Sequence, residues 1–284
     1  MPGIMLAAMT IYGRNAFFRV EILIAAGFLI LAGALVFTAL PGCSAAMEEA
    51  VKRSAGLVQG LLARLEPSPL APLVSLSGAA LFSLAALVCI HFFFEKTQAP
   101  EILFVSLFVF SFSFEIMRLI TPLQKIWNLP SLYPLLASRT LLFGRFFGIF
   151  SLFAASVCAA GMEIQKHLNV ILAVAFVSLV IALGIPIDIL TWDSSFSMIN
   201  GYPSLIYLME AAVLLITVLS FFISAWSRGA PEYAAVGLGS LIVFTGRNIL
   251  FSADTLISPL PGLFLLAAGE WLISTKLHRV YLWL

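Results

Sequence analysis

The chain has 284 residues, of which 62% are apolar and only 10% are charged. A soluble domain would carry roughly a quarter charged residues to face water, so this composition excludes a soluble globule and makes a lipid bilayer the expected solvent. The formal net charge is +1 and no basic cluster occurs, so the sequence gives no indication of a nucleic-acid partner.

Eight apolar stretches are long enough to cross the ~30 Å hydrocarbon core of a bilayer. Inside that core the backbone must satisfy its own hydrogen bonds, which favours helices. The sequence therefore predicts an all-α, polytopic bundle of eight transmembrane helices that forms a single integral membrane domain over residues 1–284. The expected spans are 22–40, 73–94, 102–120, 138–162, 170–190, 204–226, 233–251 and 257–277.

Lysine and arginine in the short connections set the expected orientation, because the cytoplasmic side of a membrane protein carries their excess. With the N-terminus inside, the short outer loops hold only Lys125 together with Asp193 and Asp254. Both termini are therefore expected in the cytoplasm, and the expected location is a bacterial cytoplasmic membrane. The basic residues assigned to the cytoplasmic side are Arg14, Arg19, Lys96, Lys166, Arg228, Lys276 and Arg279.

The first outer loop has its own helical pattern. Apolar residues recur at helical spacing between about residues 45 and 66, with charges on the other side, which predicts an amphipathic helix on the outer face. This helix is interpreted as a cap over the bundle, and a substrate-gating lid is the alternative.

The segment from Leu40 to Ser44 follows an apolar run and resembles the end of a bacterial lipoprotein signal. Cleavage there would leave Cys43 as a lipidated N-terminus and seven helices. Pro41 and the long leader depart from the usual pattern, so an intact chain is expected.

Cysteine and histidine are sparse. Of the three cysteines, Cys89 and Cys158 fall inside apolar segments, which argues against a disulfide framework and a cysteine-rich metal site. The three histidines are widely scattered, which argues against a zinc site or a histidine-ligated haem. The sequence therefore predicts no metal and no cofactor.

Six ionisable residues fall deep within the expected spans. An ionisable side chain at the centre of a membrane helix costs at least ~2.5 to 3.5 kcal/mol, so it normally faces the bundle interior and has a partner. Three glutamates and three arginines are enough for an internally paired network. They are Glu115, Arg118, Arg145, Glu210, Arg247 and Glu270.

The depths of these residues can be compared at ~1.5 Å per helical residue. All of them except Glu270 fall in the outer half of their spans, and Glu270 lies nearer the middle. Ser111, Glu115 and Arg118 are spaced four and three residues apart, which places them on one helix face. The sequence therefore predicts one polar site reachable from outside. Asp188 follows Pro186, and a bend at the proline is expected to turn its carboxylate toward the same cavity.

Arginine suggests the class of ligand, because its planar fork binds carboxylate or phosphate with two hydrogen bonds and stays charged in protein. If glutamates pair with two of the arginines, the third is free for an anion. A small anionic or zwitterionic molecule is therefore the expected ligand. The alternative is that all six charges pair with one another and only hold the helices together.

Three functions fit this pattern. The favoured one is a transporter or permease-like protein, and the second is a ligand-sensing membrane module that signals through a membrane or cytoplasmic protein partner. A lipid-modifying enzyme is the third, disfavoured because no HExxH, GxSxG or Walker motif occurs and no histidine lies near the outer charges.

Overall fold

The computed structural model describes residues 11–39, 68, 70–97, 99–161, 167–253 and 255–282. The amphipathic helix expected at 45–66 and the lipoprotein-like Cys43 lie outside the described residues.

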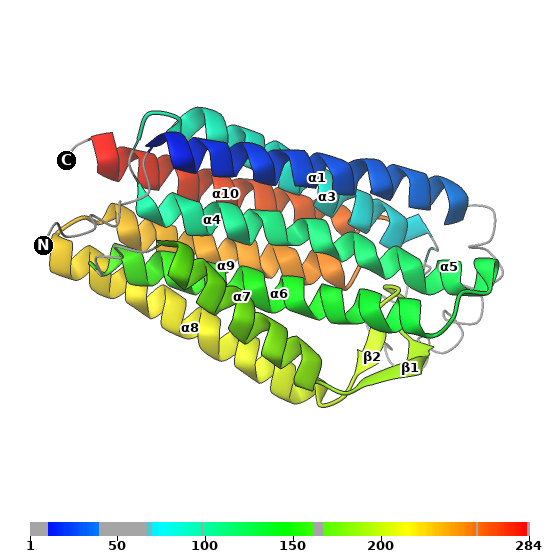
Figure 1. Cartoon of the computed structure of the whole chain (residues 1–284). Helices are drawn as coiled ribbons and strands as arrows, with labels where there is room; N and C mark the ends of the chain where they lie inside the picture. The colour runs from blue at the N-terminus through cyan, green and yellow to red at the C-terminus, as the bar shows by residue number, and fades with distance from the viewer. Residues whose placement is uncertain are drawn as a thin grey trace, which may run out of the picture.

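In the part of the chain that the structure describes, eight helical rods lie side by side in one elongated bundle, which confirms the predicted all-α class (Figure 1). One rod is composite, because its α-helical character changes to 3-10 and back within a single apolar stretch. The rods are α1 (Ile11–Ala39), α3 (Leu70–Phe94), the composite of α4 (Pro100–Ser111), η2 (Phe112–Leu119) and α5 (Ile120–Trp127), α6 (Leu132–Ala159), α7 (His167–Gly184), α8 (Pro203–Arg228), α9 (Glu232–Phe251) and α10 (Pro259–Leu282).

Local sequence accounts for several helix ends. Prolines occupy the first turn of α4 and of α8, where a missing N–H costs nothing because that group would be unpaired anyway. Helix α8 ends where Gly229 adopts a left-handed conformation with φ of 63°, which glycine reaches without a steric penalty.

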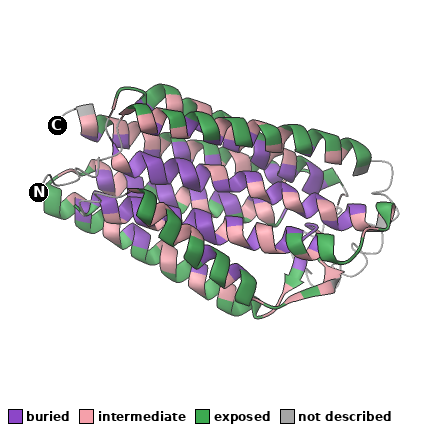
Figure 2. Ribbon diagram, viewed as in Figure 1, coloured by how far each residue is buried: buried purple, intermediate pink, exposed green. Residues whose placement is uncertain are grey.

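Seven of the rods, all except α10, are long and apolar enough to cross a membrane. The composite rod and α6 form the interior, whereas α1, α7 and α8 lie at the outside with few buried residues (Figure 2). Within an apolar stretch of 18 residues, 83% of the residues are buried in the composite rod but only 11% in α7. Exposed apolar side chains over the outer rods include Phe176 and Trp226. Such a surface is suited to lipid rather than to water.

Helix α10 packs most extensively against α9, through a row of glycines on both helices. A Cβ added to Gly246 would lie 2.9 Å from the Gly262 carbonyl oxygen, and one added to Gly269 would lie 3.0 Å from the Gly239 carbonyl oxygen. Backbones that approach this closely require small residues at the contact.

The start of α1 and the end of α10 lie at the same end of the bundle. Arg14, near the start of α1, donates to backbone carbonyls of Phe94 and Thr97 at the end of α3. Tyr281, near the end of α10, donates to Glu101 at the start of α4. We call this the termini end, and it lies at the left of Figure 1.

The prediction of a helix over residues 170–190 is wrong at its end. Helix α7 stops at Gly184, and β1 (Ile187–Trp192) then pairs antiparallel with β2 (Met198–Asn200). Pro186 disfavours a helical conformation at the residue before it, and the β-branched residues that follow fit a strand better than a helix. The opposite end of the bundle, which carries this hairpin, is called the hairpin end.

If all eight helical segments cross the membrane, connections at the same end of the bundle share a compartment. Reporters fused after Lys96, after Arg228 and at the C-terminus should all report one side, which the charge distribution predicts to be the cytoplasm. Fusions after Asn128 and Ser194, at the hairpin end, should report the other side and serve as controls. A C-terminal reporter on the same side as Ser194 would show that α10 does not cross.

Candidate functional site

Three arginines from three rods surround one phenylalanine ring near the hairpin end. The guanidinium carbons of Arg118, Arg145 and Arg247 lie 4.9, 5.0 and 5.3 Å from the ring centre of Phe251. Arginine and an aromatic face attract each other at such distances, and more strongly away from water. The structure thus brings together the three arginines that the sequence singled out.

Two glutamates pair with these arginines. Oε2 of Glu115 lies 2.7 Å from Nη2 of Arg118, and Nε of Arg145 donates to Oε1 of Glu115 at 2.9 Å. Nη2 of Arg247 donates to Oε1 of Glu210 at 3.0 Å. Five of the seven candidate residues therefore share one site. We call Glu115, Arg118, Arg145, Glu210, Arg247 and Phe251 the arginine cluster.

The 3-10 helix η2 explains how one rod supplies two members of the cluster. Side chains three residues apart eclipse each other in a 3-10 helix, so Glu115 and Arg118 lie in line and form an ion pair. At eight residues η2 is long, since 3-10 runs beyond about four residues are uncommon and often mark functional positions within helices. Ser111, expected on the same face, instead packs against Gly148 of α6.

The loop between β1 and β2 lies against the arginine cluster. Oδ1 of Asp193 accepts hydrogen bonds from the backbone N–H groups of Ser195 and Ser197 and from the Ser195 hydroxyl, at 3.0, 2.9 and 2.8 Å. Phe196, at a φ of 64°, is buried in an apolar cluster with Ile116 of η2. Arg118 also holds the loop, because its Nη1 lies 3.5 Å from the Ser195 carbonyl oxygen.

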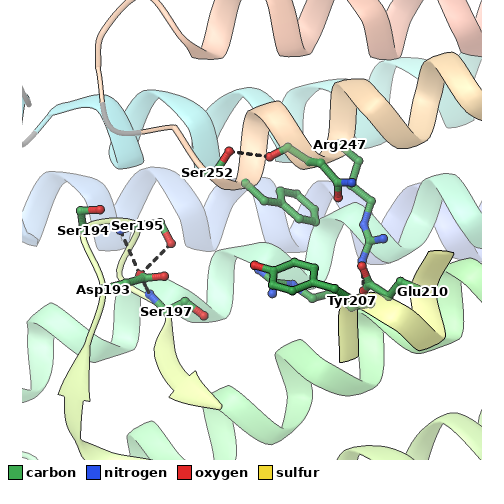
Figure 3. Close-up of a pocket in the computed structure, with 11 residues that line it drawn as sticks. Asp193, Ser194, Ser195, Ser197, Tyr207, Glu210, Arg247 and Ser252 are labelled. Atoms are coloured by element: carbon green, nitrogen blue, oxygen red, sulfur yellow. Dashed lines mark hydrogen bonds and ion pairs between the residues drawn. The ribbon is translucent and has the colours of Figure 1, made fainter. Parts of the chain in front are cut away.

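A cavity of about 300 Å³ lies between the hairpin loop and the helices. Figure 3 shows Asp193 and its serines on one side, Arg247 and Glu210 on the other, and Tyr207 between them. Arg247 is 4% exposed, and no acceptor among the described residues bonds to its Nη1. The cavity is lined by Arg145, Asp193, Ser194, Ser195, Ser197, Tyr207, Glu210, Arg247, Asn248, Phe251 and Ser252.

The remaining two candidates lie elsewhere. Glu270 of α10 is buried and accepts a hydrogen bond from Ser274 at 3.0 Å, while its Oε2 has no partner among the described residues. Asp188 lies on β1 and accepts a hydrogen bond from Thr191 at 2.6 Å. Neither lines the cavity.

Sequence reasoning also missed two buried glutamates. Glu21 of α1 is 3% exposed, and neither carboxylate oxygen has a hydrogen-bond partner among the described residues. The expected span begins at residue 22 and so excludes Glu21, whereas α1 runs over Ile11–Ala39. Glu101 accepts hydrogen bonds from the hydroxyls of Tyr233 and Tyr281 at the termini end.

The fold and the site define the class: the chain is a multi-pass integral membrane protein with a charged cavity at one end of a helix bundle. No family model, no curated protein and no solved structure matches the chain. Among the described residues, no group of three or more His, Cys, Asp or Glu side chains is arranged to hold a metal ion.

Proposed function

We propose that the protein is a transporter or permease-like carrier of a small anionic or zwitterionic molecule, which it binds in the cavity at the hairpin end. The observation that carries this proposal is the buried Arg247 guanidinium, which lines the cavity with Nη1 unpartnered by any described residue. A buried donor without an acceptor costs about 1 to 3 kcal/mol, and more when it is charged. A bound anion supplies the missing acceptor.

The distribution of charge among the helices supports the same conclusion. Three arginines share two glutamates in the arginine cluster, and Glu115 pairs with two of them. The helices therefore present a surplus of one positive charge beside the cavity. A network that served only to hold helices together would be expected to give each arginine its own carboxylate.

The composite rod favours transport. Its helix changes to 3-10 within an apolar stretch of 25 residues, and the 3-10 segment carries two charges of the site. Transporters commonly bind their substrates where a membrane helix is interrupted, because such a segment can rearrange without breaking a continuous helix.

Ligand sensing is the second candidate, and the interior packing favours it. Phe108, Phe112 and Phe147 belong to one buried apolar core that occupies the composite rod and α6. A sensor needs no path through such a core, because binding at the hairpin end would be transmitted to a partner protein. Uptake of the ligand into proteoliposomes would decide for transport.

Arg247→Lys is expected to abolish ligand binding with little loss of folded protein. Lysine keeps the positive charge beside Glu210 but lacks the planar fork that binds carboxylate or phosphate with two hydrogen bonds. Unfolding temperatures of purified protein should be measured with inorganic phosphate, carboxylates and amino acids. A ligand at a hundred times its Kd stabilises the wild type by about 2.7 kcal/mol, and this gain should disappear in the variant.

Arg139→Lys is the matched control. Arg139 donates to the backbone carbonyls of Ala182 and Ile185 at the end of α7 and does not line the cavity. Ligand stabilisation should survive this change. Equal stabilisation of the wild type and Arg247→Lys would refute binding in the cavity.

A further inference from the structure

We infer that the ligand is a zwitterion that places its anionic group on Arg145 and Arg247 and its ammonium group on the hairpin side of the cavity, at Asp193. This inference rests on the proposed function and narrows its ligand class. It also assigns the hairpin loop a part in recognition that no helix provides.

The anionic half of the ligand has two donors to bind. Arg145 uses Nε and Nη2 for Glu115, and Arg247 uses Nη2 for Glu210. The remaining Nη1 of Arg247 has no acceptor among the described residues, and none of them accepts from Nη1 of Arg145. Both side chains line the cavity. Both guanidinium groups lie beside the Phe251 ring, so the two donors can bind the two oxygens of one carboxylate or phosphate.

The ammonium half is matched by the hairpin side. Asp193 engages Oδ1 in three hydrogen bonds of its own loop, and Oδ2 has no hydrogen bond to the described residues. A carboxylate has about four lone-pair positions in all, so acceptor capacity remains for an ammonium group. The hydroxyls of Ser194, Ser195 and Ser197 line the same side of the cavity.

The charges explain why a zwitterion fits better than a simple anion. The arginine cluster carries three positive and two negative charges, and Asp193 across the cavity makes the sum zero. The net charge is thus positive on the helix side and negative on the hairpin side, and Figure 3 shows Arg247 and Asp193 on opposite sides of the cavity. A simple anion would leave a net charge in a poorly solvated site, whereas a zwitterion satisfies both sides and keeps the site neutral. A volume near 300 Å³ restricts the ligand to a small molecule.

The test compares molecules that differ only in the ammonium group. Purified protein is heated with L-alanine or L-lactate, L-phenylalanine or L-phenyllactate, L-glutamate or L-2-hydroxyglutarate, and phosphoethanolamine or ethylene glycol phosphate. In each pair a hydroxyl replaces the amine, and the last pair represents a lipid head group. For at least one pair, the amine is expected to raise the unfolding temperature at a concentration about tenfold or more below that of its partner, as for a charge-assisted hydrogen bond.

Asp193→Asn then isolates the charge. Asparagine retains an Oδ1 acceptor for the three loop hydrogen bonds, so the loop keeps its shape while the negative charge is lost. The preference for the amine should disappear in this variant. Glu95→Gln removes an exposed carboxylate at the termini end and should leave the preference unchanged.

Two results would overturn the inference. If the hydroxyl compounds bind as well as the amines, the ligand is recognised as an anion alone. If Asp193→Asn keeps the preference for the amine, the ammonium group is bound by a residue other than Asp193. Stabilisation that Arg247→Lys abolishes would still support the proposed function in that case. If no compound of any pair, and no phosphate, changes the unfolding temperature, both the inference and the proposed function fail.

Discussion

Glu115→Gln is expected to lower the stability of the bundle more than any other single neutralisation of a glutamate. Glu115 is 2% exposed and pairs with both Arg118 and Arg145, so its loss leaves one buried and one partly buried guanidinium group uncompensated. Removing one partner of a buried ion pair costs about 3 to 5 kcal/mol. Two such losses approach the entire stability of many proteins, about 5 to 15 kcal/mol. Folded yield and unfolding temperature in detergent measure the effect.

Glu270→Gln is the matched control for this prediction. Glu270 is 5% exposed, so its burial resembles that of Glu115, but it has no cation partner among the described residues. The same chemical change should therefore cost far less. The double variant Glu115→Gln/Arg145→Gln should recover much of the yield, because only Arg118 is then left uncompensated. Equal yields of the Glu115 and Glu270 single variants would show that the ion pairs do not hold the bundle together.

Much of the site could be predicted from sequence because charge in a membrane is restricted by depth and by helix face. Glu115, Arg118, Arg145, Glu210 and Arg247 lie at similar depths, and these are the residues that converge. Depth alone does not say which neighbour a helix faces, however. For this reason the sequence predicts Glu270 in the same site, whereas in the structure its carboxylate accepts a hydrogen bond from Ser274 of the same helix and does not line the cavity.

The part of the site formed by the hairpin could not be predicted. Residues 170–190 form one nearly continuous apolar run, and hydropathy does not distinguish the last part of a span from a strand that follows it. Pro186 is the one sequence feature that argues against a continuous helix here, and from the sequence alone it is interpreted as a bend. As a consequence, Asp193 and its serines were treated as an outer loop, and Asp188 was expected in the cavity that Asp193 lines. Nothing in the sequence distinguishes Phe251, whose ring the three arginines surround, from the other phenylalanines, of which the chain has 25 in all.

The close contact of α9 with α10 has a signal in the sequence. Gly239 and Gly246 are seven residues apart, and so are Gly262 and Gly269, which places each pair on one helix face. Small residues on one face of each helix permit the two backbones to approach.

Gly246→Leu is expected to prevent α9 and α10 from packing and to give little or no folded protein. A Cβ at this position would lie 2.8 Å from the Leu266 backbone nitrogen and 2.9 Å from the Gly262 carbonyl oxygen. Because these neighbours are backbone atoms, no side-chain rotation can make room, and the helices must separate. Inserting even one or two methylenes into a packed core costs about 1 to 3 kcal/mol, and a leucine side chain adds more than that.

Gly246→Ala gives a measurable version of the same effect, with Gly27→Ala as its control. Gly27 lies on α1, where nothing is found within 4 Å of an added Cβ, so alanine there should be neutral or should stabilise by up to about 1 kcal/mol through its higher helix propensity. Gly246→Ala should instead lower the unfolding temperature. It should also weaken ligand binding, because α9 carries Arg247 and Phe251 and any separation from α10 shifts both. Equal unfolding temperatures for the two alanine variants would show that α9 and α10 do not touch along their glycines.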